Sequence, residues 1–575
     1  MKKNHLFLII IFAALTIVSA CKEDFLDVKP KGSLDVGVLA TEDGINALLI
    51  GAYSMLDGTN SSFGWEAAST NWVYGDIRGM IGNKGTDAGD QPDINPLQTF
   101  NETSTNPYLN VKWRAVYESV SRCNSAILVT AQALANGTIT QAQADLFVKQ
   151  ARALRGWYHF EAWRMWKMVP YVDENTDQLT LTNAEDISDK IIADLTEGTT
   201  LPDNMGQIGR FNGTVSKILL AKVKMQTKQD YAGALVHLND ARTGTKPNGA
   251  AIGLAPTYGE IFDIVNRNGI ESVYTVQYSV NDGSGAWNGG WGEVLNFPYK
   301  GGGSPGGCCG FFQATQEYVN SFRTSGGLPL LDNSYNNDPV VNDFGLTPDD
   351  PFVEDAGPLD PRLDWSIGRR GIPYWDWGIH TGSDWIRDQT YAGPYSPKKQ
   401  VYKKSQEGQY TEVGNWTSGW TANGYRMIRF SDVILMIAEC QIETGDLDGA
   451  LDNINLLRAR AANPAGFVME DDGSAPAANY EIAEYPDGYF TSADIANTAL
   501  RMERKLELGM EGHRWFDLNR WGITQTELNR VLAYEKTMPW GNLMYGAATV
   551  GPEDATFPIP QRQIDLSQGN LVQNR

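Results

Sequence analysis

Cysteine and histidine are scarce in this chain of 575 residues, which contains five of each. So few thiol and imidazole groups leave little material for zinc centres or thiol chemistry, and no Cys-x-x-Cys motif occurs. Basic residues are also in deficit: 69 acidic against 47 basic residues give a formal net charge of −22. This charge repels phosphate backbones and argues against nucleic acid as a partner. We predict no cofactor and no metal-binding residues.

Long apolar runs are absent except for one, Leu6 to Val18, which follows two lysines. As a helix this run would reach about 20 Å, less than the ~30 Å of a bilayer core, so residues 1–20 indicate a secretory signal peptide. Small residues lead directly into Cys21, which resembles a bacterial lipoprotein signal and predicts lipidation of that cysteine. The alternative is an ordinary signal peptide with a chance cysteine. Residues 22–24, Lys-Glu-Asp, resemble a tag for export to the outer face of the outer membrane.

Apolar residues recur at helical spacing in both the first and the last third of the chain. The predicted helices span residues 110–135, 142–168, 214–227, 231–242, 427–444 and 448–462. The last two pairs carry small residues at similar places around a tight turn, which is the construction of a TPR-type helical hairpin. Their spacing differs by one residue, so the repeat is degenerate, and a plain helical bundle is the alternative. The sequence predicts a mostly α fold with degenerate TPR-type hairpins as its scaffold.

Residues 255–425 differ from the helical parts on either side. Gly and Pro become frequent, helical spacing fades, and residues 273–280 alternate like a short strand. We therefore predict an N-terminal scaffold over 21–254, a long irregular Trp- and Gly-rich ligand-binding region with few short strands over 255–425, and a C-terminal helical part over 426–575. Adjacent Cys308 and Cys309 lie in this middle region, where a disulfide between neighbours, two free thiols or simple packing all remain open.

Eight of the 17 tryptophans lie between residues 287 and 420, on loop-like backbone. An indole stacks against the C–H face of a sugar ring, and nearby polar groups can then bind the hydroxyls. Trp287 and Trp291 lie in a segment too rich in glycine for a packed element, Trp375 lies beside Asp376, and Trp385 lies near Asp384 and Arg387. These four are the candidate ligand-binding aromatics, and core packing is the alternative for each.

No recognisable catalytic motif survives inspection. Residues 301–306 satisfy the Gly-x-Ser-x-Gly pattern, but Pro305 follows the serine and lacks the N–H that an oxyanion hole needs. A pair of carboxylates, as glycoside hydrolases use, cannot be recognised from spacing alone. We predict no enzyme and no catalytic residues, with a glycoside hydrolase as an alternative.

Residues 501–522 resemble the C-terminal signature of the SusD/RagB-like outer-membrane nutrient-binding lipoproteins. The matching positions are Glu503, Arg504, Glu507, Leu508, Glu511, Gly512, Arg514, Asp517, Leu518, Arg520, Trp521 and Gly522. The end of the chain, its start near residues 25–30 and residues 425–461 resemble the same family, so the resemblance runs almost end to end. We interpret Glu503, Glu507 and Glu511 as one helix face that pairs with Arg504 and Arg514 and locks the last helices to the scaffold.

The resemblance implies a surface lipoprotein that binds oligo- or polysaccharide without cleaving it and delivers it to a SusC-like TonB-dependent transporter. It implies an outer-membrane location facing the cell exterior, and a ligand site built from the irregular middle region plus an early loop. Here that loop would be residues 72–91, with Asp76, Arg78 and Lys84 as further ligand-binding residues. Some relatives serve peptide uptake, so peptide cargo on the same scaffold is the second hypothesis. The glycan itself is not specified.

Overall fold

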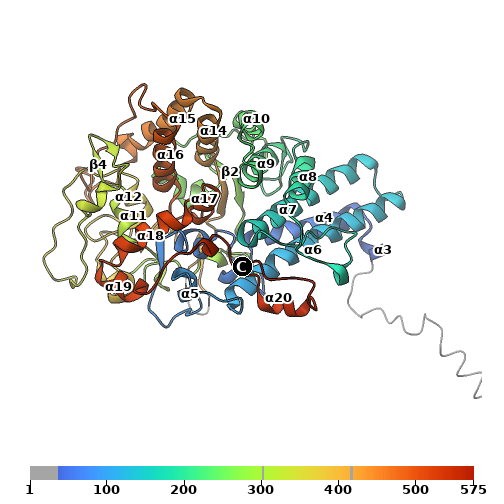
Figure 1. The fold of residues 1–575 in the computed structure, drawn as a ribbon, viewed down its shortest axis with the longest axis horizontal. Coiled ribbons are helices and arrows are strands. Elements are labelled where there is room, and N and C mark those ends of the chain that lie inside the picture. The colour runs from blue at the N-terminus through green and yellow to red at the C-terminus, as the bar shows by residue number, and fades with distance from the viewer. Residues whose placement is uncertain (1–35, 301–302, 415–416, 418) are drawn as a thin grey trace, which may run out of the picture.

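The computed structural model describes residues 36–300, 303–414, 417 and 419–575 (Figure 1). The predicted signal peptide, Cys21 and the Lys-Glu-Asp segment lie outside the described residues. The long helices are α4 (Glu42–Tyr53), α6 (Pro107–Ala135), α7 (Gln141–Trp166), α8 (Ser188–Gly198), α9 (Gly213–Lys228), α10 (Tyr231–Arg242), α14 (Phe430–Thr444), α15 (Leu447–Ala461), α16 (Ala493–Leu508) and α18 (Thr524–Glu535). The prediction of a mostly α fold is confirmed.

These helices pack against one another as a continuous scaffold. Successive helices from α6 to α10 pack against one another, and α10 then packs on α14, which joins the N-terminal helices to α15 and α16. Figure 1 shows α4, α6 and α7 at one end of the molecule and α14 to α16 toward the other, with α9 and α10 between them. The scaffold is therefore assembled from both ends of the sequence.

The two hairpins that look alike in sequence share the same turn. Asp230 caps α10 by accepting a hydrogen bond from the Gly233 N–H at 2.9 Å, and Asp446 caps α15 through the Gly449 N–H at 3.0 Å. A Cβ on either glycine would lie 2.3 Å from the capping carboxylate, so glycine lets the cap form without a shift of the Asp side chain at both turns. The recurrence of glycine in the sequence thus reflects helix capping.

The middle region contributes only short strands among the described residues. They form two-stranded antiparallel sheets: β1 (Gly82–Gly85) with β3 (Phe311–Ala314), β2 (Ser272–Val276) with β10 (Tyr425–Arg429), β4 (Thr324–Ser325) with β5 (Leu328–Pro329), β6 (Ile367–Gly368) with β7 (Ser396–Pro397), and β8 (Thr411–Glu412) with β9 (Trp420–Thr421). The pair β2–β10 joins the two ends of the predicted irregular region at the scaffold. The short helices are α3 (Val36–Leu39), α5 (Ile94–Gln98), α11 (Gln316–Asn320), α12 (Leu363–Ser366), α13 (Gln389–Ala392), α17 (Arg514–Arg520), α19 (Pro539–Tyr545) and α20 (Gln561–Leu566).

Two local predictions were wrong. The helix expected from residue 427 begins at Phe430, because residues 425–429 are extended and pair with β2. The segment 72–91, expected as a binding loop, contains the π-helical turn η3 (Trp72–Ile77) and strand β1. Residues 72 to 86 of this segment are all buried, so most of it belongs to the interior.

The C-terminal charge network locks the last helices to the scaffold, but with partners other than those expected. Helix α16 ends at Leu508, so Glu511 is not on the helix that carries Glu503 and Glu507. Arg362 bridges both of those glutamates, with its Nη1 atom 2.5 Å from Glu503 Oε1 and 3.1 Å from Glu507 Oε2. Arg458 completes the pairing of Glu503.

Glu507 and Glu511 are also held by cations from distant segments. Arg460 lies 2.6 Å from Glu507, and Arg429 lies 3.1 Å from Glu507 and 2.7 Å from Glu511. Lys399 completes the pairing of Glu511 at 2.8 Å. Glu507, Arg460, Arg429 and Lys399 are buried and the Glu511 side chain is only 8% exposed, so the network joins the middle region, α15 and the end of the chain in the interior.

The two arginines of the predicted pairing have separate partners. Arg504 binds Asp432 and Asp517, both at 2.9 Å, and Arg514 binds Glu527 at 3.1 Å. Arg504 points away from the glutamates because neighbouring residues on a helix face different directions.

Candidate ligand-binding site

A pocket of about 620 Å³ opens where the scaffold meets the middle region. Its walls come from helix α4 with the 3₁₀ turn η1 (Ser54–Asp57), the segments 59–61 and 207–210, strand β2, and the segment 277–288. The volume lies in the range typical of small-molecule sites. The lining residues are Ile50, Tyr53, Ser54, Leu56, Asp57, Thr59, Asn60, Ser61, Gln207, Gly209, Arg210, Tyr274, Val276, Gln277, Ser279, Trp287 and Asn288.

Trp287 stands at this pocket with half of its surface exposed (50%), an unusual position for the largest apolar side chain. Its ring stacks on Trp291, with centroids 4.7 Å apart and planes at 15°. Trp291 in turn meets Trp420 edge to face at 5.3 Å and donates its indole N–H to the Ala286 carbonyl at 3.1 Å. The exposed indole is therefore held in place by two further tryptophans.

The structure gives Trp287 and Trp291 different roles. Trp287 lines the pocket, whereas Trp291 lies behind it, partly buried, and begins the 3₁₀ turn η7 (Trp291–Glu293). Gly283 and Gly285 adopt positive φ angles of 83° and 66° in the loop before Trp287. This conformation is favourable for glycine, and it explains the glycine-rich sequence around the pair.

Two buried tyrosines and Val276 form the floor of the pocket. Tyr53 accepts a hydrogen bond from the Phe211 N–H at 2.9 Å and donates to Gln150 Oε1 at 3.2 Å. Tyr274 donates to the Gly209 carbonyl at 2.8 Å. Because each hydroxyl is bound by the protein, the floor presents a fixed aromatic surface.

One cation and one carboxylate line the pocket, and neither has an ion-pair partner among the described residues. Arg210 donates from Nε to Gln207 Oε1 at 3.0 Å and from Nη2 to Asn46 Oδ1, and its guanidinium lies 5.2 Å from the centre of the Tyr53 ring. These contacts leave Nη1 without a protein partner in the described part of the chain.

Asp57 is the acidic residue of the pocket, opposite in charge to Arg210. Its Oδ1 atom accepts the Thr59 N–H at 2.8 Å, and a side-chain hydrogen bond from Thr59 also lowers the pKa of the carboxyl group, though less than burial raises it. Burial raises the pKa of Asp57 to about 7, because removal from water disfavours the charged carboxylate. The carboxyl group is thus recessed but open to a ligand.

Trp375 and Trp385 lie away from this pocket, in a separate aromatic cluster. Trp385 is buried against Tyr374 and His380, with ring centroids 5.6 and 4.9 Å away. Trp375 is partly buried and packs on Trp365 at 5.0 Å. The structure gives both side chains packing roles and does not bring them to Trp287 and Trp291.

Asp76 and Arg78 lie in the protein interior with protein partners. The Asp76 carboxylate accepts the Gly512 and Arg514 N–H groups at 2.8 and 3.2 Å, and burial raises its pKa to about 6. Arg78 pairs with Glu102 at 2.6 Å and with Asp554 at 3.0 Å. Because both are fully buried, they anchor the chain end to the scaffold and do not reach the pocket.

Lys84 is also buried and is not among the residues that line the pocket. It donates to the Ala88 and Asp90 carbonyls at 3.2 and 2.8 Å, and its ammonium lies 5.2 Å from the centre of the Tyr391 ring. Burial lowers the pKa of Lys84 to about 8. Its role is to fix the turn that follows β1.

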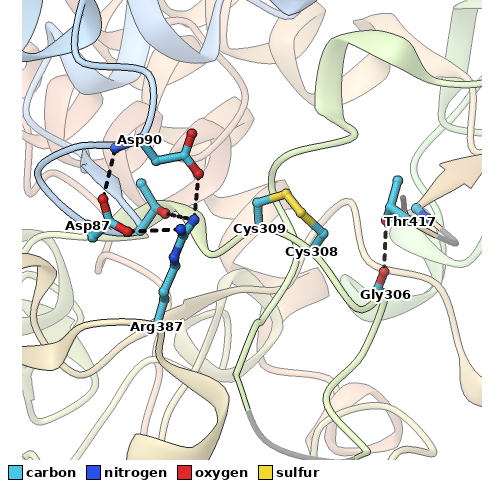
Figure 2. The surroundings of a disulfide bond; sticks show 9 residues. Asp87, Asp90, Gly306, Cys308, Cys309, Arg387 and Thr417 are labelled. Atoms are coloured by element: carbon cyan, nitrogen blue, oxygen red, sulfur yellow. Dashed lines mark hydrogen bonds and ion pairs between the residues drawn. A yellow bond between two sulfur atoms is a disulfide. The ribbon is translucent and has the colours of Figure 1, made fainter. Parts of the chain in front are cut away.

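Cys308 and Cys309 form a disulfide between neighbouring residues, which settles one of the open alternatives. Figure 2 shows it between the Asp87–Asp90–Arg387 cluster on one side and Gly306 with Thr417 on the other. Arg387 binds Asp87 at 2.9 Å and Asp90 at 2.5 Å. Across the described residues, no group of three or more His, Cys, Asp or Glu side chains has the arrangement of a metal site.

Sequence reasoning missed most of the pocket. Asp57, Arg210 and Tyr274 come from three segments separated by more than 60 residues each, and none belongs to a motif. The only available signal was the cluster of polar residues directly after an apolar helix, at residues 57–61.

The chain belongs to the SusD family, whose family model matches residues 270–575. A SusD-like protein from Bacteroides ovatus is 21% identical over 285 residues, and this match spans 47% of the chain and about half (49%) of that relative. SusD-like protein P2 from Formosa agariphila is 23% identical, and the match covers 94% of both proteins.

Solved structures share the fold along nearly the whole chain. A laminarin-binding SusD-like protein has a TM-score of 0.64 at 19% identity, covering 93% of this chain and 99% of that one. Surface glycan-binding protein A from Bacteroides thetaiotaomicron, solved with laminarihexaose, has a TM-score of 0.63 at 20% identity with the same coverage. These matches confirm the predicted family and fold. No helix in the described part of the chain combines the length and apolar character that a bilayer crossing requires.

Proposed function

We propose that the protein is a cell-surface glycan-binding lipoprotein that captures oligo- or polysaccharide and delivers it to a SusC-like TonB-dependent outer-membrane transporter. The observation that carries this proposal is the half-exposed Trp287 indole, backed by Trp291, at a pocket lined with polar side chains. A flat ring binds the C–H face of a sugar with little ordering cost, because stacking already fixes it.

The polar lining supplies groups for the sugar hydroxyls. Arg210 and Asp57 each keep hydrogen-bonding capacity that the protein does not use, and amides surround them. These amides are Asn60, Gln207, Gln277 and Asn288. Membership of the SusD family and the glycan ligands named for the two structural relatives support the same function.

The pocket supports binding without cleavage. Glycoside hydrolysis commonly needs two carboxyl groups about 5 to 9.5 Å apart around the scissile bond. Asp57 is the one carboxylate among the described residues that line the pocket. We therefore propose a binding role and no hydrolase activity.

Affinity electrophoresis tests the binding function. The mature chain without its anchor would migrate through gels that contain single polysaccharides, beside Trp287→Ala and, as a control, Leu179→Ala, which changes an 83% exposed apolar residue elsewhere. We expect retardation by at least one glycan, lost only in Trp287→Ala. Retardation by no glycan, together with binding of peptides, would favour peptide cargo.

The anchor and the transporter need separate tests. Cys21→Ser should release the protein from the outer membrane, because the acylated thiol is the proposed anchor. Wild type solubilised in mild detergent should co-purify with a large TonB-dependent barrel. Unchanged membrane retention of Cys21→Ser, or repeated isolation of the wild type alone, would contradict these parts of the proposal.

A further inference from the structure

The charged groups around the pocket do not favour an anionic ligand, although the pocket contains an arginine. The lining holds one cation, Arg210, and one carboxylate, Asp57. At the rim, Arg122 donates to the pocket residue Ser54 but is neutralised by Glu118 at 3.0 Å. Asp282, which holds the lining residue Asn288 at 2.8 Å, adds a further carboxylate at the opposite side.

Arg210, the one cation among the described residues that line the pocket, is constrained by its neighbours. Arg210 is bound through Nε and Nη2 and rests against the Tyr53 ring, which leaves Nη1 as its one nitrogen without a protein partner among the described residues. These contacts occupy the Nε–Nη2 edge, one of the two edges through which a guanidinium binds a carboxylate or sulfate with two parallel N–H groups.

The groups around Asp57 offer its charged form little cationic compensation. Glu293, on η7, is close enough that the Asp57 charge raises its pKa further, beyond the larger effect of burial. Tyr278 is a neutral phenol whose pKa burial raises far above its usual value. Arg122 of α6 attracts the Asp57 carboxylate only weakly, since no nitrogen of Arg122 lies within ion-pair distance of it in the described residues.

We propose that the pocket selects uncharged glycans and that Asp57 is the residue that disfavours uronate-bearing or sulfated ones. A polyanionic ligand would place its charges beside Asp57 and Asp282, with Arg210 as the one cation among the described lining residues to offset them, and it would approach a protein of net charge −22. Neutral hydroxyls can instead donate to the Asp57 carboxyl oxygens, which keep acceptor capacity, and accept from Arg210 Nη1. This inference rests on the proposed glycan-binding function.

Matched pairs of polysaccharides test it, each pair sharing one backbone. The probes are laminarin with sulfated laminarin, hydroxyethylcellulose with carboxymethylcellulose, and pullulan with carboxymethylpullulan, with alginate and polygalacturonate as natural polyanions. We expect retardation by at least one neutral member at pH 8, and affinity at least tenfold lower for its charged partner.

Asp57→Asn tests the residue. The asparagine can keep the Oδ1 contact to the Thr59 N–H, so the shape is preserved while the charge is lost. We expect the ratio of neutral to anionic affinity to fall at least fivefold. Asp452→Asn, an exposed change of equal charge on the distant helix α15, should leave the ratio unchanged. Lowering the pH from 8 to 6 should reduce the ratio in wild type but not in Asp57→Asn.

The outcomes separate the inference from the function it rests on. Strongest binding to an anionic glycan, or an equal ratio in wild type and Asp57→Asn at pH 8, would overturn the selectivity while leaving glycan binding in place. Binding of none of these polysaccharides would overturn the proposed function, and the selectivity with it.

Discussion

Arginines and carboxylates occur in two very different settings in this protein. Around Glu507, three arginines converge on one carboxylate: Arg362, Arg429 and Arg460 lie within 3.1 Å of it, all buried. In the Trp287 pocket, Arg210 and Asp57 have no ion-pair partner in the described residues. The first cluster satisfies its charges internally, and the second leaves them for a ligand.

The comparison shows that residue type does not distinguish a structural charge from a binding one. The difference lies in whether the charged atoms already have partners, because a buried charge that is fully paired has nothing left to offer a ligand. Asp76, Arg78 and Lys84 follow the Glu507 pattern, since each is buried with protein partners. The family signature therefore belongs to the scaffold, and the pocket lies outside its motif.

Removal of the Glu507 charge should have the largest effect on the stability of the protein, because it disrupts the buried Glu507 cluster. Glu507→Gln leaves three buried arginines with one carboxylate fewer, and we expect the free energy of unfolding to fall by about 3 to 5 kcal/mol. Urea denaturation would measure it. Glu553→Gln, an exposed change near the chain end, is the control. A loss below 1 kcal/mol would mean that the network is not needed for stability.

Acid should also lower the stability that the buried ion pairs near the chain end provide. Burial alone would raise the pKa of Asp517, but its partners Arg504 and Arg520 lower this pKa to about 2. The group stays charged in the folded protein at pH values where the unfolded chain takes up a proton, so its stabilisation is lost as the pH falls from about 4 to 2. Asp517→Asn should flatten this part of the stability curve by about 2 kcal/mol. An unchanged acid slope would contradict the prediction.

The stability contributed by Asp57 should depend on pH in the opposite sense to that of Asp517. Its pKa is raised to about 7, so the folded protein holds a proton that the unfolded chain releases near pH 4. Stability contributed by Asp57 is therefore lost as the pH rises from about 4 to 7. Asp57→Asn should be about 1 to 2 kcal/mol less sensitive to this rise than wild type. Thermal unfolding between pH 4 and 8 would measure the difference, with Asp452→Asn as control, and identical slopes would refute it.

Substitution of the buried Trp385 should have the smallest effect on glycan affinity. Trp385 lies in the aromatic cluster with Tyr374 and His380, away from the pocket. Trp385→Phe should lower stability by about 1 kcal/mol through lost packing, and change glycan affinity less than twofold. Titration calorimetry of the folded variant would test this. A tenfold loss of affinity would move the site to that cluster.

The sequence predicted the scaffold well because helices there are defined by local spacing and caps. Residues 231–242 form a helix with the predicted bounds, and the repeated glycines at 233 and 449 mark the turns that Asp230 and Asp446 cap. The start of α14 was missed, since pairing of residues 425–429 with β2 is a contact across 150 residues that spacing cannot reveal.

The candidate site was predictable only where a local pattern existed. Trp287 was found because glycines surround it, whereas Trp385 was chosen for its charged neighbours and is buried in an aromatic cluster. Asp57 and Arg210 lie 153 residues apart in sequence and meet only through the packing of η1, β2 and the 207–210 segment. Asp76 and Arg78 have apolar neighbours in the sequence, namely Ile77, Met80 and Ile81. These neighbours were a local sign of burial, but the family resemblance was given more weight.

The most direct test of the account is the affinity of Trp287→Ala for the glycan that retards the wild type, measured by titration calorimetry beside Trp287→Phe and Leu179→Ala. We expect a loss of about 2 kcal/mol, roughly 30-fold in Kd, for the alanine variant, a smaller loss for the phenylalanine variant and no change for the control. The unfolding temperature should be unchanged, because the side chain is half exposed. Wild-type affinity in a folded Trp287→Ala variant would contradict the assignment of this pocket as the glycan site.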